Sequence, residues 1–226
     1  MDLIVIRILV LVFSIVVHEV AHGWAALLLG DPTAKQQGRL TLNPLPHIDP
    51  MGSIVVPAVL AMFGSIPFGW AKPVPVDVGR LRNPRDDHPK VAAAGPISNL
   101  ILAFFFAVAL GVTVGVAGAP VSNSSSPSSN EFFFVLFQTG IIINVVLAMF
   151  NLIPLPPLDG SWIVSRFLPL GLRIRYENLR RFGMLIVIGF MVAMRYTPLG
   201  GLFSAGLYAV AAPYFNLAQN VANALR

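Results

Sequence analysis

Residues 8–29 read ILVLVFSIVVHEVAHGWAALLL, an apolar run long enough to cross a lipid bilayer as a helix. The ionisable groups of this run are His18, Glu19 and His22. Residues at positions i and i+4 of a helix lie on one face, so the two imidazoles can bind one Zn²⁺ while the glutamate acts on a water bound to the metal. A lone carboxylate is costly at membrane depth, which indicates that the cluster has a function.

The whole chain has the composition of a membrane protein. Its 226 residues are 56% hydrophobic and 11% charged, with a mean hydropathy of +0.76. It contains no cysteine, so any zinc must be held by histidine and carboxylate. The formal charge of +5 comes with no nucleic-acid-binding motif, so we expect the lipid bilayer as a partner and no nucleic acid.

Several apolar segments are long enough to consider as membrane spans. A weaker segment, Ile48–Ile66, is interrupted by prolines and glycines, and we expect it to enter and leave the membrane on one side, with a full crossing as the alternative. The sequence therefore predicts one all-α polytopic membrane domain over residues 1–226, with five to six transmembrane or re-entrant helices. The clearer spans are Leu3–Leu29, Val91–Ala117, Phe132–Ile153, Met184–Met194 with its flanking residues, and Leu199–Leu217.

The basic residues of the loops predict the orientation of these spans. By the positive-inside rule the three basic regions are cytoplasmic and the serine-rich stretch 121–130 is external. We therefore expect a multi-pass protein of the cell (inner or plasma) membrane, with the His18–His22 cluster toward the cytoplasmic side. The basic residues are Lys35, Arg39, Lys72, Arg80, Arg82, Arg85, Lys90, Arg166, Arg173, Arg175, Arg180 and Arg181.

A candidate for the third metal ligand follows a later apolar segment. Residues 151–160 read NLIPLPPLDG, in which three prolines forbid a regular helix and a glycine permits an unusual backbone. Asp159 can therefore turn back toward the bundle. It reaches the depth of His18 and His22 only if the two helices run parallel, an arrangement that the loop charges predict independently.

With these motifs the sequence resembles the site-2 protease family of intramembrane zinc metallopeptidases, and among them the compact bacterial members without a PDZ domain. The resemblance implies that His18, His22 and Asp159 bind zinc and that Glu19 is catalytic. It also implies a transmembrane protein substrate, a family core over residues 3–160 and extra helices over about 177–221. The matching pieces are HEVAH at 18–22, GDPTAK at 30–35, GRLTLNP at 38–44, HIDP at 47–50, FGWAKPVPV at 68–76, AGPISN at 94–99, and residues 151–160.

Two asparagines near helix ends are further candidates for the site. Three protein ligands leave a fourth zinc position for water, from which Glu19 can take a proton and later protonate the leaving amine. Asn99 and Asn151 can hydrogen-bond the oxyanion or the substrate backbone. The alternative for both is a hydrogen bond between helices, which is common for asparagine in membranes.

The segment KPVPV at 72–76 is a candidate for holding the substrate extended. Its two prolines remove N–H donors from one edge of a strand, while Lys72, Val74 and Val76 keep theirs on the other. We expect a small membrane-embedded β element here, which pairs with the substrate by β-augmentation. The alternative is a loop stiffened by proline.

Other interpretations remain open at this stage. A metal or proton transporter could use the His18–His22 cluster as a relay, and a non-catalytic protein could keep the fold to bind membrane helices. His47 and Asp49 form a second possible ligand pair, although a turn with a backbone-bonded aspartate is the favoured interpretation. The sequence does not indicate an oligomeric state.

Overall fold

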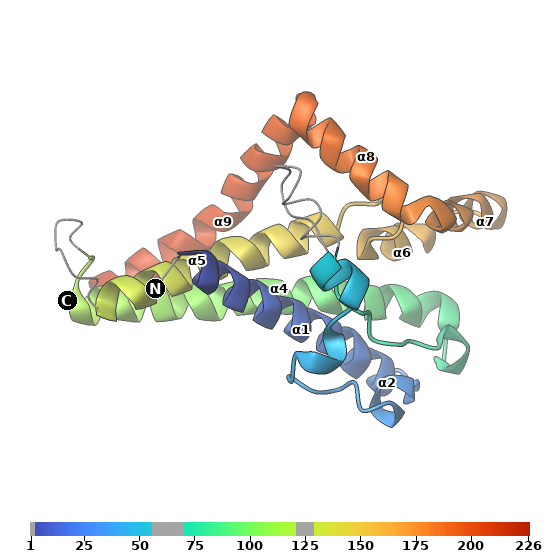
Figure 1. Cartoon of the computed structure of the whole chain (residues 1–226), viewed down its shortest axis with the longest axis horizontal. Helices are drawn as coiled ribbons and strands as arrows, with labels where there is room; N and C mark the ends of the chain where they lie inside the picture. Colours follow the sequence, from blue (N-terminus) through green and yellow to red (C-terminus); the bar gives the residue numbers. More distant parts are fainter. Residues whose placement is uncertain (1–2, 56–69, 121–128) are drawn as a thin grey trace.

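The computed structural model of the chain describes residues 3–55, 70–120 and 129–226. These residues form helices joined by turns and extended segments, and the described part of the chain contains no β-strand. Four long helices run side by side through the molecule (Figure 1). They are α1 (Leu3–Leu28), α4 (Pro84–Ala117), α5 (Ser129–Asn151) and α9 (Leu199–Ala224).

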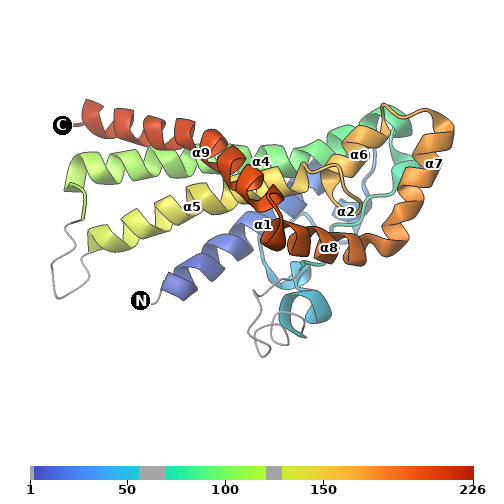
Figure 2. The ribbon, with the colours of Figure 1, turned by 90° about the horizontal axis from the view of Figure 1, so that it is seen from above.

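The long helices run in the predicted directions. Helices α1 and α5 run the same way, and α4 runs in the opposite direction between its neighbours (Figure 2). Helix α4 packs on α1, α5 and α9, so it is the central element of the bundle. The parallel arrangement of α1 and α5 brings the C-terminal ends of both helices to one end of the molecule, as the argument for Asp159 requires.

Small side chains let the helices of the bundle approach closely, which is typical of membrane proteins. A Cβ atom added at Gly111 of α4 would lie 2.5 Å from the carbonyl oxygen of Ala218 in α9. The two helices are therefore in near backbone contact at this point. The buried core around it consists of Ala103, Ala107, Leu110, Ile141, Val145, Ala211 and Ala218.

Helix α4 begins at Pro84, seven residues before the predicted start at Val91. The predicted start rests on the apolar run alone. Asn83 and Pro84 are typical of a helix start, and the two acidic residues of the first turn interact favourably with the helix dipole. As a result His88 lies on this helix, and it lines the same cavity as His18 and His22.

A glycine with a left-handed backbone ends α1. Gly30 has a φ of 110°. Its N–H donates to the carbonyl of Leu27, and the N–H of Asp31 donates to that of Ala26. This Schellman motif turns the chain back, and the buried Asp31 carboxylate accepts the N–H of Asp77 at 2.7 Å. The end of α1 is thereby tied to the extended segment, residues 70–77.

The expected β element is not present in the described residues. The extended segment forms no ladder because its backbone groups are bonded to other partners: the N–H of Lys72 donates to the carbonyl of His47, and the N–H of Val74 donates to Glu19. The surrounding elements are short helical turns. They are α2 (Thr33–Gln36), η1 (Leu45–His47), η2 (Pro50–Val55) and η3 (Val78–Arg80).

The number of spans differs from the prediction of five to six. The described residues contain three helices long and apolar enough to cross a membrane, or four if the bent pair formed by Leu170–Tyr196 and α9 is one span. The two parts of this pair meet at 89°. Helix α8 (Gly183–Tyr196), which ends the first part, has 14 residues, fewer than the roughly 20 that a span needs. Most of the predicted re-entrant segment Ile48–Ile66 lies outside the described residues.

Candidate metal centre

Two imidazoles and one carboxylate converge at one end of the bundle. His18 and His22 project from α1, and Asp159 is the first residue of α6 (Asp159–Ser165). The two Nε2 atoms are 3.1 Å apart, and Asp159 Oδ2 lies 3.2 Å from that of His18 and 3.4 Å from that of His22. Within residues 3–55, 70–120 and 129–226, this is the one group of three or more His, Cys, Asp or Glu side chains whose possible metal-ligand atoms lie within 4.8 Å of one another.

Hydrogen bonds on the far side of each ring define the tautomers. His22 Nδ1 lies 2.8 Å from the carbonyl oxygen of Val91, which can only accept, so Nδ1 carries the proton. His18 Nδ1 lies 2.6 Å from Asn99 Oδ1, which also accepts. In the neutral form of each ring Nε2 then carries the lone pair, and this atom faces Asp159, as in metal-ligating histidines.

The donor set fits a zinc ion. Three lone-pair atoms that face one another repel unless a cation lies between them, and the buried Asp159 Oδ2 has no hydrogen-bond partner. Tetrahedral zinc with Zn–N and Zn–O distances of 2.0–2.2 Å separates its ligand atoms by about 3.3 Å. The separations of 3.1–3.4 Å among His18, His22 and Asp159 match that value and leave a fourth position for water.

Close packing of α6 on the end of α5 places the carboxylate. A Cβ atom added at Gly160 would lie 2.2 Å from the carbonyl oxygen of Leu152 and 2.6 Å from that of Ile153. Only glycine permits this approach, which holds the first turn of α6 against the last turn of α5. The prolines between them break the helix as predicted, and Asp159 faces α1.

Helix α4 forms the floor of the site through a glycine. A Cβ atom added at Gly95 would lie 2.5 Å from His22 Nε2 and 2.6 Å from His18 Nε2. These distances are shorter than any van der Waals contact, and the neighbours are rings held by hydrogen bonds on their other side. The backbone of α4 therefore lies directly beside the two nitrogen atoms that face Asp159.

We expect Gly95→Ala to weaken zinc binding by about 100-fold or more, because the added methyl displaces both imidazoles and an outer-shell change alone costs 10- to 100-fold. Zinc titration of the purified full chain measures the change. The matched control is Gly189→Ala in α8, where an added Cβ meets nothing within 4 Å. Equal zinc affinity in Gly95→Ala and Gly189→Ala would contradict the arrangement.

Glu19 faces the same cavity as the three candidate ligands. The cavity has a volume of about 350 Å³, and Val74, Asn151 and Trp162 also line it. Glu19 Oε2 accepts the backbone N–H of Val74 at 2.8 Å. The carboxylate is thus held on the wall of the cavity, where it can exchange a proton with a water or a substrate atom inside it.

Arg39 and His47 hold the extended segment beside Glu19. The Arg39 guanidinium donates to the carbonyls of Lys72 and Pro73 at 2.8 and 3.3 Å. His47 Nε2 lies 3.0 Å from the carbonyl oxygen of Thr41, and its own backbone carbonyl accepts the N–H of Lys72. From the sequence, Arg39 is only one of the basic loop residues, because nothing in its local pattern shows that the side chain is buried against a distant segment.

The structure places the remaining candidates as follows. Asn99 is fully buried and bonds His18, Ser14 and Asn144 across three helices. Asn151 lines the cavity and donates to the carbonyl of Leu147 in its own helix.

The candidates of the extended segment differ in position. Val74 and Val76 line the cavity, whereas the backbone of Lys72 is bonded by Arg39 and His47. Asp49 accepts the N–H of Gly52, as the turn interpretation requires.

A cluster behind Asp159 was missed by the sequence analysis. The Arg180 guanidinium lies over the ring of Trp162, 3.1 Å from its centroid, and donates to Ser161 Oγ at 2.7 Å. The imidazole of His88 packs on the Trp162 ring, and the two ring centroids are 4.0 Å apart. These contacts tie η4 (Leu179–Phe182) and α4 to the helix that carries Asp159.

Comparison with known proteins identifies the family. The family model described as peptidase family M50 matches residues 6–194. The chain belongs to peptidase family M50. This is the site-2 protease family, as the sequence resemblance predicted, so the protein is a zinc metalloprotease with apolar helices that could span a membrane.

Two curated relatives illustrate the membership in M50. The chain is 40% identical over 195 residues to "Putative zinc metalloprotease YwhC" of Bacillus subtilis, covering 85% of this chain and 81% of that protein. It is 28% identical over 180 residues to "Putative zinc metalloprotease Rip2" of Mycolicibacterium smegmatis, covering 79% of this chain and 63% of the relative. No solved structure matches the chain.

Proposed function

We propose that this M50 peptidase is an intramembrane endopeptidase, which cuts peptide bonds within the membrane-spanning segments of other proteins. The observation that carries the proposal is the position of the metal-ligand group on α1, a helix of 26 residues that is long and apolar enough to cross a membrane. The site also lies against Gly95 of α4, a second helix of membrane-spanning length. A protease with its site between two such helices acts on peptide bonds at membrane depth.

The geometry of the cavity supports a role for each residue. His18, His22 and Asp159 would hold the zinc ion, which would supply an acidified water and polarise the scissile carbonyl. Glu19 would accept a proton from a water in the cavity and later donate it to the leaving nitrogen, a role supported by the position of its carboxylate in the same cavity as the candidate ligands.

The extended segment is the proposed binding edge for the substrate. A transmembrane helix hides its peptide bonds until it unwinds, so the enzyme must hold the unwound stretch by its backbone. The N–H of Val74 lies in the cavity wall and is held by Glu19 in this structure. We infer that a substrate carbonyl takes over this N–H and thereby places the neighbouring peptide bond beside the zinc ligands.

Val74→Pro removes that donor, and we expect cleavage to fall by about 10- to 100-fold, the cost of leaving a buried carbonyl of the bound substrate without its partner. Zinc binding stays unchanged because the Val74 N–H bonds Glu19 and none of the three candidate ligands. The control Val74→Ala keeps the N–H and retains most of the activity. Cleavage by Val74→Pro at the level of Val74→Ala would remove the proposed role.

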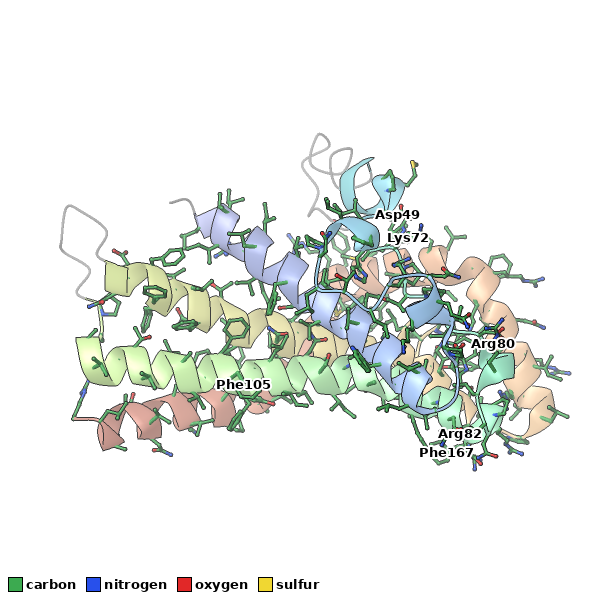
Figure 3. The ribbon with its side chains drawn as sticks, turned by 90° about the horizontal axis from the view of Figure 1, so that it is seen from below. Asp49, Lys72, Arg80, Arg82, Phe105 and Phe167 are labelled. Atoms are coloured by element: carbon green, nitrogen blue, oxygen red, sulfur yellow. The ribbon has the colours of Figure 1, made fainter. Side chains whose placement is uncertain are left out.

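We also propose that the site lies toward the cytoplasmic side of the plasma membrane. The basic residues Lys72, Arg80 and Arg82 lie at one end of the molecule (Figure 3). Two further arginines contact α6, the helix of Asp159, or its end: Arg180 donates to Ser161, and Arg166 at the end of α6 pairs with Asp86 of α4. Because the chain has no cysteine, single cysteines introduced at Arg175 and Ala119 report the orientation. We expect an impermeant thiol reagent added to intact cells to label the Ala119→Cys variant and not the Arg175→Cys variant, and the reverse result would overturn the orientation.

The function is tested with the purified full chain in liposomes that contain a panel of single-span proteins. We expect cuts inside the apolar segment of at least one substrate, as mapped by mass spectrometry. Cleavage stops with a zinc chelator and returns with added zinc. Zinc-loaded enzyme that cuts only outside the bilayer segments would contradict the proposal.

A further inference from the structure

A chain of buried polar side chains connects the metal site to the interior of the bundle. Ser14 of α1, Asn99 of α4 and Asn144 of α5 each have 0% of their surface exposed. All three lie on helices long and apolar enough to cross a membrane. Polar groups in such positions are expensive unless they are bonded to one another, and they mark functional positions more often than residues on the outer surface do.

The carbonyl of Gly140 fixes the direction of this chain. Asn144 Nδ2 lies 2.9 Å from the carbonyl oxygen of Gly140 and 2.9 Å from Ser14 Oγ. A backbone carbonyl can only accept, so the amide nitrogen of Asn144 must face Gly140. The Asn144 oxygen is consequently turned toward Asn99.

Asn99 transmits this direction to His18. Its Nδ2 donates to Asn144 Oδ1 at 2.9 Å and to the carbonyl of Ser14 at 3.3 Å, so both hydrogens of the amide are used. Asn99 Oδ1 therefore faces His18 Nδ1 at 2.6 Å. Since that oxygen has no hydrogen to donate, His18 carries its proton on Nδ1 and keeps the Nε2 lone pair for the metal.

The two histidines reach the same tautomer by different routes. His22 donates directly to the carbonyl of Val91, which fixes its ring in one step. His18 has no backbone carbonyl among the recorded partners of its Nδ1, and its acceptor is the oxygen of Asn99. An amide can rotate to exchange its oxygen and nitrogen, so Asn99 specifies the tautomer only while its own partners hold it. These are Asn144 at 2.9 Å and, by a longer bond, the carbonyl of Ser14 at 3.3 Å.

We propose that Asn144 is a positioning residue of the metal centre, which fixes the amide of Asn99 and, through it, the ring orientation and tautomer of His18. The proposal rests on the proposed zinc ligation by His18. The hydrogen bonds of Asn144 are with Asn99, Ser14 and Gly140, and it is not among the residues that line the cavity. Without Asn144, only the longer bond to the Ser14 carbonyl orients the Asn99 amide. The amide then rotates and presents its N–H to His18, the imidazole proton moves to Nε2, and the lone pair needed for zinc is lost.

The primary test is the zinc affinity of Asn144→Leu, measured on the full chain in detergent by competition with a chromophoric chelator. We expect binding to weaken by about 10- to 100-fold, the usual effect of removing an outer-shell partner. The control is Thr113→Val, which removes a partly buried hydroxyl of α4 that bonds the carbonyl of Ala109 in its own helix. The affinity of the control stays at the wild-type value.

A double-mutant cycle separates positioning from helix packing. If Asn144 acts only through Asn99, Asn144→Leu produces no further loss of zinc affinity in an Asn99→Leu background. A packing role predicts that the two losses multiply. The ¹⁵N imidazole shifts of the metal-free protein give a second measurement: we expect His18 as the Nδ1–H tautomer in the wild type and a large Nε2–H population in Asn144→Leu.

The outcomes decide between the inference and the proposed function. Wild-type zinc affinity in a folded Asn144→Leu, losses that multiply in the double variant, or an unchanged His18 tautomer would overturn the role of Asn144 and leave the protease proposal intact. If Asn144→Leu does not fold, Asn144→Ser is measured instead, because serine is well tolerated between membrane helices. A wild-type chain that binds no zinc refutes the proposed function itself.

Discussion

We expect Glu19→Gln to abolish proteolysis and to leave zinc binding intact. A glutamine has nearly the same shape, but it cannot accept a proton from water or donate one to the leaving nitrogen. General acid–base catalysis contributes about 10²- to 10⁴-fold, and Glu19 serves in both directions of the proton transfer, so we expect cleavage to fall by about 10³-fold or more. The cleavage rate in liposomes and the zinc content of the same preparation measure the two effects together.

The combination of effects distinguishes catalysis from structure. The backbone N–H of Val74 can still bond the side-chain oxygen of glutamine, so the wall of the cavity keeps its shape. Glu131→Gln in α5 is the matched control, since this glutamate is exposed in the first turn of its helix. Substantial cleavage by Glu19→Gln would show that another group carries the proton.

The second large expected effect is a loss of zinc affinity in Asp159→Ala. The carboxylate is the one negative charge among the three candidate ligands, and its Oδ2 lies within 3.4 Å of both imidazole nitrogens. Loss of a residue that only supports a metal ligand costs up to about 100-fold in affinity. We expect a larger fall in zinc affinity for Asp159→Ala, and we expect proteolysis to be lost in parallel. Titration with a competing chelator measures the affinity.

Two further variants sharpen the result for Asp159. Asp159→Asn keeps a carbonyl oxygen without the charge, and we expect it to bind zinc more tightly than Asp159→Ala and less tightly than the wild type. Glu177→Ala removes a carboxylate of α7 (Leu170–Asn178) that pairs with Arg173, and its affinity stays at the wild-type value. A wild-type affinity in Asp159→Ala would mean that the third ligand is a different residue.

The candidate metal ligands could be named from the sequence because the geometry that brings them together is local or follows from helix direction. His18 and His22 need only the regularity of one helix to lie together, and the structure places their Nε2 atoms 3.1 Å apart. Asp159 is 137 residues further along than His22, but the loop charges give the helix directions, and these place both segments at one end of the bundle.

Features that depend on side-chain contacts between distant segments could not be predicted in this way. The extended segment looks like a strand because of its alternating prolines, yet its donors are taken by Glu19 and by the carbonyl of His47. The contact of Arg39 with the carbonyls of Lys72 and Pro73 joins segments 33 residues or more apart and has no local signal. Asn144 lies in an apolar run like any interhelical asparagine, and only the three-dimensional arrangement connects it to His18.

The zinc K-edge X-ray absorption spectrum of the full chain with one equivalent of zinc tests the central claim most directly. The account predicts a first shell of nitrogen and oxygen atoms at about 2.0–2.2 Å, with outer-shell scattering from two imidazoles. His22→Ala loses the scattering of one imidazole. A wild-type first shell that contains sulfur, or a spectrum that is the same in His22→Ala, would contradict it.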